Sequence, residues 1–338
     1  MSEKQITHNN HYVPQFYLKN WSEDGNTIFT YPLLVSNEKF PYWNRESIRN
    51  IAVWRDLYTR KIAQQEIDDF EKWFDREFEM PAKPVLDKLL RDEKITKAEN
   101  IIISRFIAAQ FVRTPSGLNK MLAWLRSNTP DIMQEEVNEL NEKIKDRGYT
   151  FKRKSVDKEL ELLPIKVNLD REESTIQVES IVGRSMYLYF VKHLLTKTIK
   201  QMYNHRWYVI QAADGVSFPT TDDPVICLNF RNENDYDFNG GLGQKHGNII
   251  MPLSPNKLIF TQIGDKRDFC ALNKSIYWST LFRKMIIQHA HRFVFADKPQ
   301  KGMLAINPRV VNKELYDKEQ GEMKRWHESN ISADESIK

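Results

Sequence analysis

The spacing of the hydrophobic residues changes near residue 205, and this change limits the chain to a mixed fold. Before it, apolar side chains recur at three- and four-residue steps, which is the period of an amphipathic helix. After it, short β-branched and aromatic runs alternate with turn-forming residues, as in antiparallel strands. We therefore predict an α+β fold, with an N-terminal β segment, a helical middle, and an antiparallel sheet flanked by helices in the C-terminal half.

The sequence signals for the helices differ in strength. The strongest is the capping box Thr96-Lys97-Ala98-Glu99, which precedes an apolar run ending at Arg113-Thr114-Pro115. Hydrophobic periodicity predicts the others, over residues 64–78, 131–147, 174–203 and 273–291.

The strands are predicted mainly in pairs. A turn through Asp214-Gly215 is expected to join strands at residues 207–211 and 225–228, and a second pair is expected at residues 249–250 and 258–263. Another strand is predicted at residues 293–296, and Asp24-Gly25-Asn26 predicts the turn of a short N-terminal hairpin. Residues 231–247 are rich in Asn, Asp and Gly, so we predict a long mobile loop beside the sheet.

A length of 338 residues suits one large domain or two ordinary ones. We predict one domain over residues 8–312, composed of an N-terminal β and helical part (8–148) and a helix and sheet part (174–312). The basic stretch Lys152-Arg153-Lys154 is expected to be a loop or joint between them, and residues 313–338 a charged tail that is helical and then frays.

Composition excludes several classes of protein. The formal net charge of +4 by itself predicts neither a nucleic-acid nor a membrane partner. Cys227 and Cys270 lack the spacing of a zinc or redox site and the density of a secreted scaffold. The polar start has no signal-peptide core, and no stretch approaches about 18 apolar residues. We predict a cytoplasmic protein with no membrane partner.

The charges are nevertheless unevenly distributed. No acidic residue lies between Ser180 and Ala213, where Lys197 and Lys200 occur among aromatic residues, and residues 270–296 are also free of acids. Such basic stretches predict phosphate contacts with nucleic acid. The alternative is a solvated basic face above core aromatics.

The first candidate for chemistry is the histidine pair in His8-Asn9-Asn10-His11. Neutral imidazole is both a good metal ligand and a general base, so His11 is a candidate for either role. The alternative is a hydrogen-bonded turn residue that precedes a strand.

The second candidate lies in the capped helix. Gln110 continues an apolar stripe, so its amide must find a partner in the interior or cost about 1 to 3 kcal/mol. Arg113, at the helix C-terminus, either complements the helix dipole or binds a phosphate or carboxylate. Arg105 is a further candidate for substrate binding on the same helix.

The third candidate is Asp222-Asp223-Pro224. Carboxylates suit Mg²⁺, and neighbouring side chains of an extended segment point to opposite sides, so one could face a site while the other caps the turn. A turn without chemistry is the alternative. The signatures of P-loop, dinucleotide-binding, serine hydrolase and zinc protease sites do not occur.

The segment His11 to Ser22, HYVPQFYLKNWS, resembles the H-x-V-P-x-x-Y-L motif of the bacterial domain-of-unknown-function 4238 family. Similarity continues in FIAAQFVRTP (106–115), TDDPV (221–225) and MPLSP (251–255), so the resemblance spans residues 8 to 297. It implies an anti-phage defence context, because members occur among defence genes of bacterial mobile elements, and it implies no particular reaction. Asp223 departs from an expected T-S-D-N-P pattern, which makes Asp222 the better candidate.

Two hypotheses follow. In the first, the protein is a defence-associated bacterial effector that acts on nucleic acid, in its most specific form a metal-assisted nuclease. His11, Asp222 and Arg113 would be catalytic, and Asp222 would hold Mg²⁺. The substrate-binding residues would be Arg105, Gln110, Lys197 and Lys200. In the second, the same residues form a structural network in a non-catalytic sensor or binding module that recognises a phage component, such as a phage protein. Whether the protein is an enzyme, and its oligomeric state, are left open.

Overall fold

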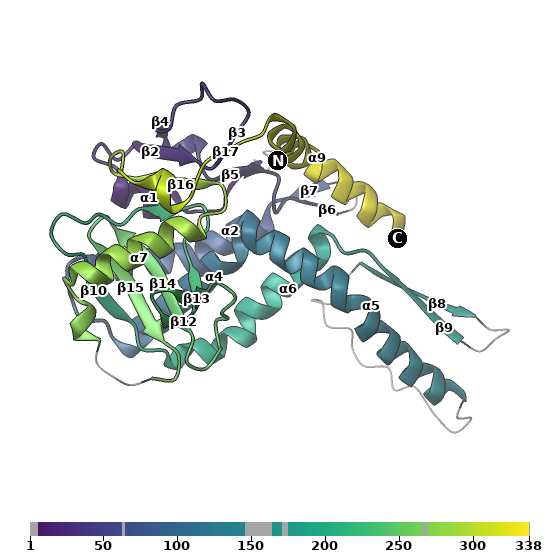
Figure 1. Ribbon diagram of the computed structural model, residues 1–338. Coiled ribbons are helices and arrows are strands. Elements are labelled where there is room, and N and C mark those ends of the chain that lie inside the picture. Colours follow the sequence, from purple (N-terminus) through teal and green to yellow (C-terminus); the bar gives the residue numbers. More distant parts are fainter. Residues whose placement is uncertain (1–5, 63–64, 146–163, 171–174, 266–268, 338) are drawn as a thin grey trace, which may run out of the picture.

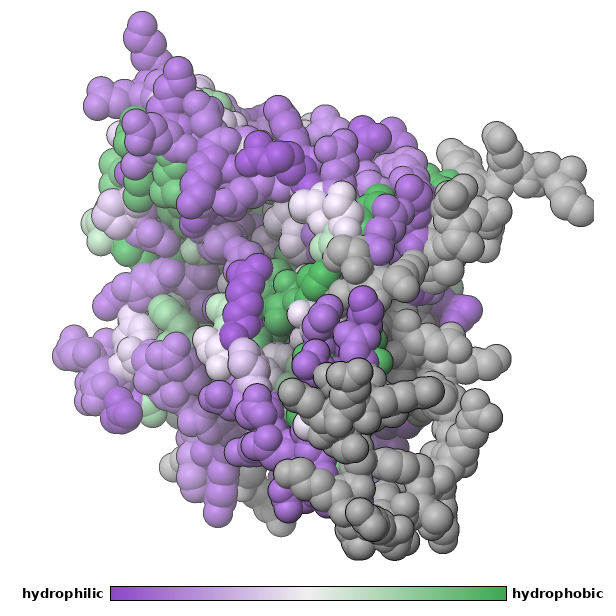
Figure 2. Space-filling view, turned by 90° about the vertical axis from the view of Figure 1, so that its right-hand side faces the viewer, coloured by the Kyte–Doolittle hydropathy of each residue, from purple (hydrophilic) through white to green (hydrophobic). Residues whose placement is uncertain are grey.

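The structure, a computed structural model, describes residues 6–62, 65–145, 164–170, 175–265 and 269–337. The predicted α+β class is confirmed. Helix α5 (Pro115–Lys145) and the hairpin of β8 (Ile165–Asp170) and β9 (Thr175–Ser180) project from the rest of the molecule (Figure 1). The face that carries this projection is largely hydrophilic, with hydrophobic residues gathered near its middle (Figure 2). No helix in the described part of the chain is long and apolar enough to span a membrane.

The N-terminal β segment is short and irregular. Its elements are β1 (Asn9–His11), α1 (Gln15–Leu18), η1 (Lys19–Trp21), β2 (Thr27–Pro32), β3 (Leu34–Val35), β4 (Asn44–Ser47), η2 (Ile48–Asn50), β5 (Val53–Arg55), β6 (Arg60–Ile62) and β7 (Gln65–Ile67). The prediction of a hairpin around Asp24-Gly25-Asn26 is wrong. The turn instead leads from η1 into β2, because the Asp24 carboxylate accepts the backbone N–H groups of Asn26 (2.8 Å) and Thr27 (2.7 Å).

A four-stranded antiparallel sheet joins the two ends of the chain. Its order is β11-β16-β2-β4, where β11 (Thr220–Thr221) and β16 (Phe293–Ala296) come from the C-terminal half. The β16 strand was predicted and is confirmed. The sheet places the Asp222 turn beside the N-terminal segment.

The second sheet has the order β10-β15-β14-β12-β13, and all its pairings are antiparallel. The strands are β10 (Tyr208–Gln211), β12 (Ile226–Asn232), β13 (Asp235–Asp237), β14 (Asn248–Ser254) and β15 (Lys257–Gln262). The predicted β14–β15 pair is confirmed, but the predicted pairing of β10 with β12 is wrong. The chain between them enters the other sheet as β11, so no tight hairpin can form. Part of the predicted loop at 231–247 is strand β13.

The helical middle contains one long rod made of α2 (Asp69–Phe74), the π-helix η3 (Asp75–Glu79) and α3 (Met80–Leu90). The predicted helix at 64–78 therefore begins too early, because residues 65–67 pair as β7 with β6. Helix α4 (Lys97–Arg113) has the predicted limits and a complete capping box. In the box the Thr96 N–H donates to Glu99 Oε2 (2.7 Å), and the Glu99 N–H donates to Thr96 Oγ1 (3.2 Å).

The predicted helix at 174–203 is shorter in the structure and is divided. Residues 175–180 form β9, in agreement with the alternating β-branched residues of Thr175-Ile176-Gln177-Val178. Helix α6 (Arg184–Thr196) and the 3₁₀ helix η5 (Thr198–Asn204) follow. The predicted charged helix at 131–147 is the second half of α5, and the basic stretch at 152–154 lies outside the described residues.

The C-terminal elements are η6 (Cys270–Leu272), α7 (Ile276–His289), α8 (Met303–Ile306), β17 (Val310–Val311) and α9 (Lys313–Ile337). The predicted tail is the helix α9, and it docks on the rest of the protein. The Trp326 indole N–H donates to the Leu57 carbonyl (3.2 Å), and the Arg184 N–H donates to Asn330 Oδ1 (2.6 Å).

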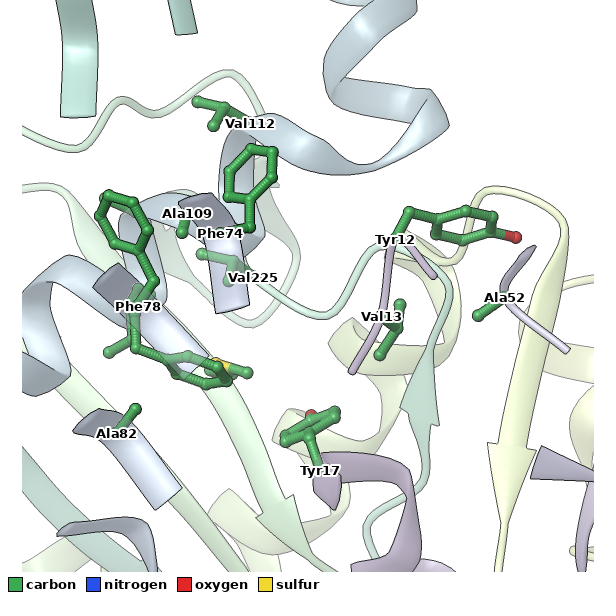
Figure 3. Packing of buried hydrophobic residues seen from close by; sticks show 14 of the residues in the cluster. Tyr12, Val13, Tyr17, Ala52, Phe74, Phe78, Ala82, Ala109, Val112 and Val225 are labelled. Atoms are coloured by element: carbon green, nitrogen blue, oxygen red, sulfur yellow. The ribbon is translucent and has the colours of Figure 1, made fainter. Parts of the chain in front are cut away.

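The His11 to Ser22 segment is buried in the main core. Tyr17 Oη lies 2.7 Å from Thr220 Oγ1 and donates to the Pro252 carbonyl (2.8 Å), and the Trp21 indole donates to the Phe218 carbonyl (2.7 Å). Figure 3 shows Tyr17 among the core side chains that surround this segment. These bonds fix the N-terminal segment against the strands that flank Asp222.

Candidate functional site

Arg113 ends α4 in a fully buried position. Its guanidinium donates to the Glu79 carboxylate and to the His11 carbonyl, and it lies 4.8 Å from the centre of the Phe74 ring. Burial lowers the pKa of Arg113, but Glu79 and the other nearby acidic groups raise it overall, so the guanidinium is always charged. The structure therefore brings the predicted residues His11 and Arg113 together.

Three carboxyl groups face Arg113 from the helical rod. Glu71, Asp75 and Glu79 recur at four-residue steps, each directly after a phenylalanine of the apolar stripe. Burial raises the pKa of Glu71 to about 7, although Arg113 opposes the shift. Like charges at this spacing repel each other, and Arg113 offsets the repulsion. The sequence analysis did not single out these acids, although their regular position directly after each phenylalanine of the stripe could have indicated them.

His11 lies at the edge of this cluster, and Gln110 lies three residues before Arg113 on α4. His11 is half-buried, its Nε2 lies 3.2 Å from the Arg49 carbonyl, and burial lowers the pKa of its imidazole. Gln110 is fully buried, and neither polar atom of its amide has a hydrogen-bond partner among the residues described. The partner expected for this amide is therefore not found within that part of the chain.

Arg105 lies on the outer side of α4, away from Arg113. It pairs with Glu77 at 3.4 Å, and its guanidinium lies 4.9 Å from the centre of the Phe78 ring. Both members of the ion pair are about one-third exposed, at 31% and 36%. Arg105 is therefore available to solvent, whereas Arg113 is not.

Asp222 is buried and holds the turn between α7 and β16. Its Oδ1 accepts the His291 N–H (3.0 Å), and its Oδ2 accepts the Arg292 N–H (2.8 Å). Burial raises the pKa of Asp222 to about 7 despite these bonds, so the carboxyl group can gain or lose a proton near neutral pH. The hydrogen bonds agree with the turn-capping alternative, and the pKa is that of a possible general acid or base.

Asp223 points in another direction and contacts the end of α4. Thr114 Oγ1 donates to Asp223 Oδ1 (3.1 Å), while Lys120 Nζ and His289 Nε2 each lie 3.7 Å from Oδ2. Burial lowers the pKa of His289. Asp223 thus connects two of the sequence motifs, and its neighbour Asp222 faces the other side, as expected for adjacent residues of an extended segment.

A cavity of about 370 Å³ lies next to Asp222. Its walls include Tyr12, Trp54 and the ion pair of Arg292, which directly precedes β16, with Glu319 of α9. Tyr12 directly follows His11, so this short segment contacts the Arg113 cluster through the His11 carbonyl and the cavity through the Tyr12 side chain. His11, Arg105, Gln110 and Arg113 do not line this cavity.

Lys197 and Lys200 are exposed at the end of α6 and in η5. The first residue of α6, Arg184, contacts α9, which also forms a wall of the cavity. The 13 residues of α6 span about 20 Å, so the two lysines lie at the other end of the helix from this contact. The structure does not place them beside Asp222.

The described residues include no group of three or more His, Cys, Asp or Glu side chains that could hold a metal ion. Asp222 has only backbone N–H groups on its two oxygens. The Mg²⁺ site expected from the Asp222-Asp223 pair thus gains no further ligand from this part of the chain.

Comparison with known proteins places the chain in one family. Residues 9–300 match the family described as "Protein of unknown function (DUF4238)", and the chain belongs to this family. No curated protein and no solved structure matches it. The match ends before α9, which forms a wall of the Asp222 cavity.

Proposed function

We propose that this DUF4238 protein is a bacterial defence effector that binds nucleic acid through Lys197, Lys200 and Arg206, which we call the basic face. The defence context comes from the family resemblance. The observation that carries the proposal is that all three side chains are exposed and have no acidic partner among the described residues. Unpaired cations on a nearly neutral protein are free to replace the counterions of a phosphate backbone.

The local structure holds these cations outward. Successive turns of a 3₁₀ helix align residues three apart, so Ile199 and Met202 share the buried side of η5. Lys200 lies on its exposed side, and Lys197 is the exposed residue directly before η5. Side chains of α4 anchor η5. For example, Ser104 Oγ donates to the Met202 carbonyl (3.2 Å). Both lysines therefore extend from a fixed backbone.

Contacts on this face are expected to be to phosphate rather than to bases. Tyr203 and Trp207 are partly buried and pack against the main core, and the Trp207 indole donates to Ser104 Oγ (2.9 Å). Their rings are therefore less available for base stacking than the sequence suggested. Binding with little sequence preference and a strong salt dependence follows.

Cleavage of the nucleic acid is the second step of the proposal and has weaker support. Asp222 would supply the acid or base, since its pKa is raised to about 7 by burial. However, Asp222 lies in a cavity of about 370 Å³, which fits a nucleotide-sized group rather than a duplex. A nuclease reaction would therefore require a strand end or a flipped nucleotide to enter the cavity.

One observation favours the alternative, a non-catalytic sensor or binding module for a phage component. Arg113 and Asp222 are both buried, and their polar atoms are largely bonded to other parts of the protein. A network of this kind maintains a fold without chemistry. In that case nucleic acid would not be cleaved, and the partner would be a phage protein.

The test measures binding of labelled RNA, single-stranded DNA and duplex DNA by fluorescence anisotropy over a range of salt. Lys197→Glu with Lys200→Glu should weaken binding and flatten the slope of log affinity against log salt by roughly two for duplex DNA. The control is Lys298→Glu with Lys301→Glu, two exposed lysines elsewhere that change the net charge equally. Equal affinities for both double variants, or no binding by the wild type, would overturn the proposal.

The same samples test cleavage. Each nucleic acid is incubated with the protein, with and without Mg²⁺ or Mn²⁺, and Asp222→Ala is compared with the wild type. Cleavage that disappears in a folded Asp222→Ala variant supports the nuclease. Binding without cleavage under all conditions supports a nucleic-acid-binding effector that is not a nuclease, and neither binding nor cleavage supports the module for a phage protein.

A further inference from the structure

The cavity beside Asp222 has an acidic lining. Four carboxyl groups reach it, from Glu46, Asp222, Glu319 and Glu322, whereas its lining contains a single arginine or lysine, Arg292. Arg292 is already paired with Glu319, in one contact at 2.8 Å. Glu322 pairs with Lys318, which lies outside the lining, at 4.0 Å. Glu46 and Asp222 therefore make no ion pair with the described residues of the cavity.

Two polar groups in this lining have no partner. Tyr12 is only 4% exposed, and its hydroxyl has no hydrogen-bond partner among the described residues. The Glu46 side chain is half-buried and likewise has no hydrogen bond or ion pair within the described chain. Both residues line the cavity, where a bound ligand can supply the partner that the described residues do not.

The rest of the lining is apolar and aromatic. Trp54 and Phe293 contribute to the walls, and the Trp54 indole N–H is occupied by the Met323 carbonyl at 3.2 Å. The ring of Trp54 is thus fixed by α9. An aromatic wall beside carboxylates attracts a cation through both the ring quadrupole and ordinary charge.

We propose that this cavity binds a small organic cation, a primary ammonium or guanidinium compound with an apolar body. The charged group faces Asp222 and Glu46 and donates to the Tyr12 hydroxyl, and the apolar body lies against Trp54 and Phe293. A free phosphate or carboxylate is disfavoured, because it would meet unpaired carboxylates while Arg292 is held by Glu319. This site is independent of the basic face, and it is an alternative to the cleavage step at Asp222, because the same lining disfavours the phosphate of a nucleotide.

Proton release accompanies binding. Burial raises the pKa of Asp222 to about 7, so part of the free protein carries a protonated Asp222 at neutral pH, and burial also raises the pKa of Glu46. A bound cation favours the ionised form of Asp222 and expels this proton. The other charged or titratable groups of the lining are Tyr12, His291, Arg292, Tyr316, Glu319 and Glu322, and Asp223 directly follows Asp222. His291 is neutral at this pH, because burial lowers its pKa to about 4.

Isothermal titration calorimetry with phenethylamine and agmatine tests the proposal on the full chain. Phenethyl alcohol is the neutral isostere of the first compound. We expect both amines to bind, the alcohol to bind at least about tenfold more weakly, and amine affinity to rise between about pH 6 and pH 8.

Glu46→Gln, which changes little but the charge, should weaken amine binding at least about tenfold, and Tyr12→Phe should also weaken it. Glu38→Gln is the control, because Glu38 is exposed and does not line the cavity. Urea denaturation of each variant checks that the fold is retained. The proposal is overturned if neither amine binds at up to about 10 mM, if amine and alcohol bind equally, or if folded Glu46→Gln binds like the wild type.

Discussion

Removing the charge of Arg113 should destabilise the protein far more than removing that of Arg105, eight residues earlier on the same helix. Arg113→Met keeps much of the apolar side chain but leaves Glu71 and Glu79, both partly buried, without their cation. Breaking a buried ion pair by deleting one partner typically costs about 3 to 5 kcal/mol. Arg105→Met breaks an exposed pair, which is worth less than about 1 kcal/mol.

The assay is urea denaturation followed by tryptophan fluorescence. A loss of about 3 kcal/mol with a slope of about 3 kcal/mol/M lowers the denaturation midpoint by roughly 1 M. The loss should be smaller at about pH 5.5 than at about pH 8. Arg113 holds down the pKa of Glu71, which burial raises, so without Arg113 this pKa rises further in the folded state. The native form then binds more protons than the unfolded chain, and its stability falls as pH increases.

Two results would refute this reasoning. One is an Arg113→Met variant that loses no more stability than Arg105→Met. The other is a loss that stays constant between the two pH values, which would show that the pKa of Glu71 does not respond to the missing charge. In either case Arg113 would not be the centre of the acidic cluster.

Two further predictions concern single buried groups. Gln110→Met should raise the free energy of unfolding by about 1 kcal/mol, since it removes an amide without a partner in the described structure, and urea denaturation would contradict this by showing a loss. The stability of the wild type relative to Asp222→Asn should fall as pH rises through about 7. The folded pKa of Asp222 is raised above its unfolded value of 3.8, so the native state loses its extra proton in that range, and an unchanged difference between about pH 5.5 and pH 8 would count against it.

Local signals determined how well the elements could be predicted. The capping box at Thr96 and Glu99 gave α4 its limits, because both partners lie within one turn of the chain. The helix expected at 174–203 failed for the opposite reason. Its first residues pair with β8, a contact that hydrophobic periodicity does not reveal. The pairing of β10 with β15 rather than β12 likewise depends on where β11 goes, which is decided by the other sheet.

The candidate site could be predicted where a polar residue lies on a core-facing stripe and therefore needs a polar partner. Gln110 and Arg113 stood out because a polar group on a core-facing stripe requires explanation, and the structure places Arg113 against Glu79. The acidic residues were harder to identify. Charged residues on a helix are usually solvated, so the sequence alone does not single out Glu71 and Glu79. Their role depends on the packing of the rod against α4.

The cavity could not be predicted from any local pattern. Tyr12, Glu46, Asp222 and Glu319 come from four distant segments, and each has an ordinary structural explanation when taken alone. What distinguishes them is a relation between the segments: Arg292 is neutralised by Glu319, while Glu46 and the Tyr12 hydroxyl have no partner in the described structure. Since the cost of a buried polar group depends on its partners and not on its type, this excess of acceptors appears only after the chain has folded. The same excess makes the chemistry of the missing partner specific, because only a cation or a hydrogen-bond donor relieves it.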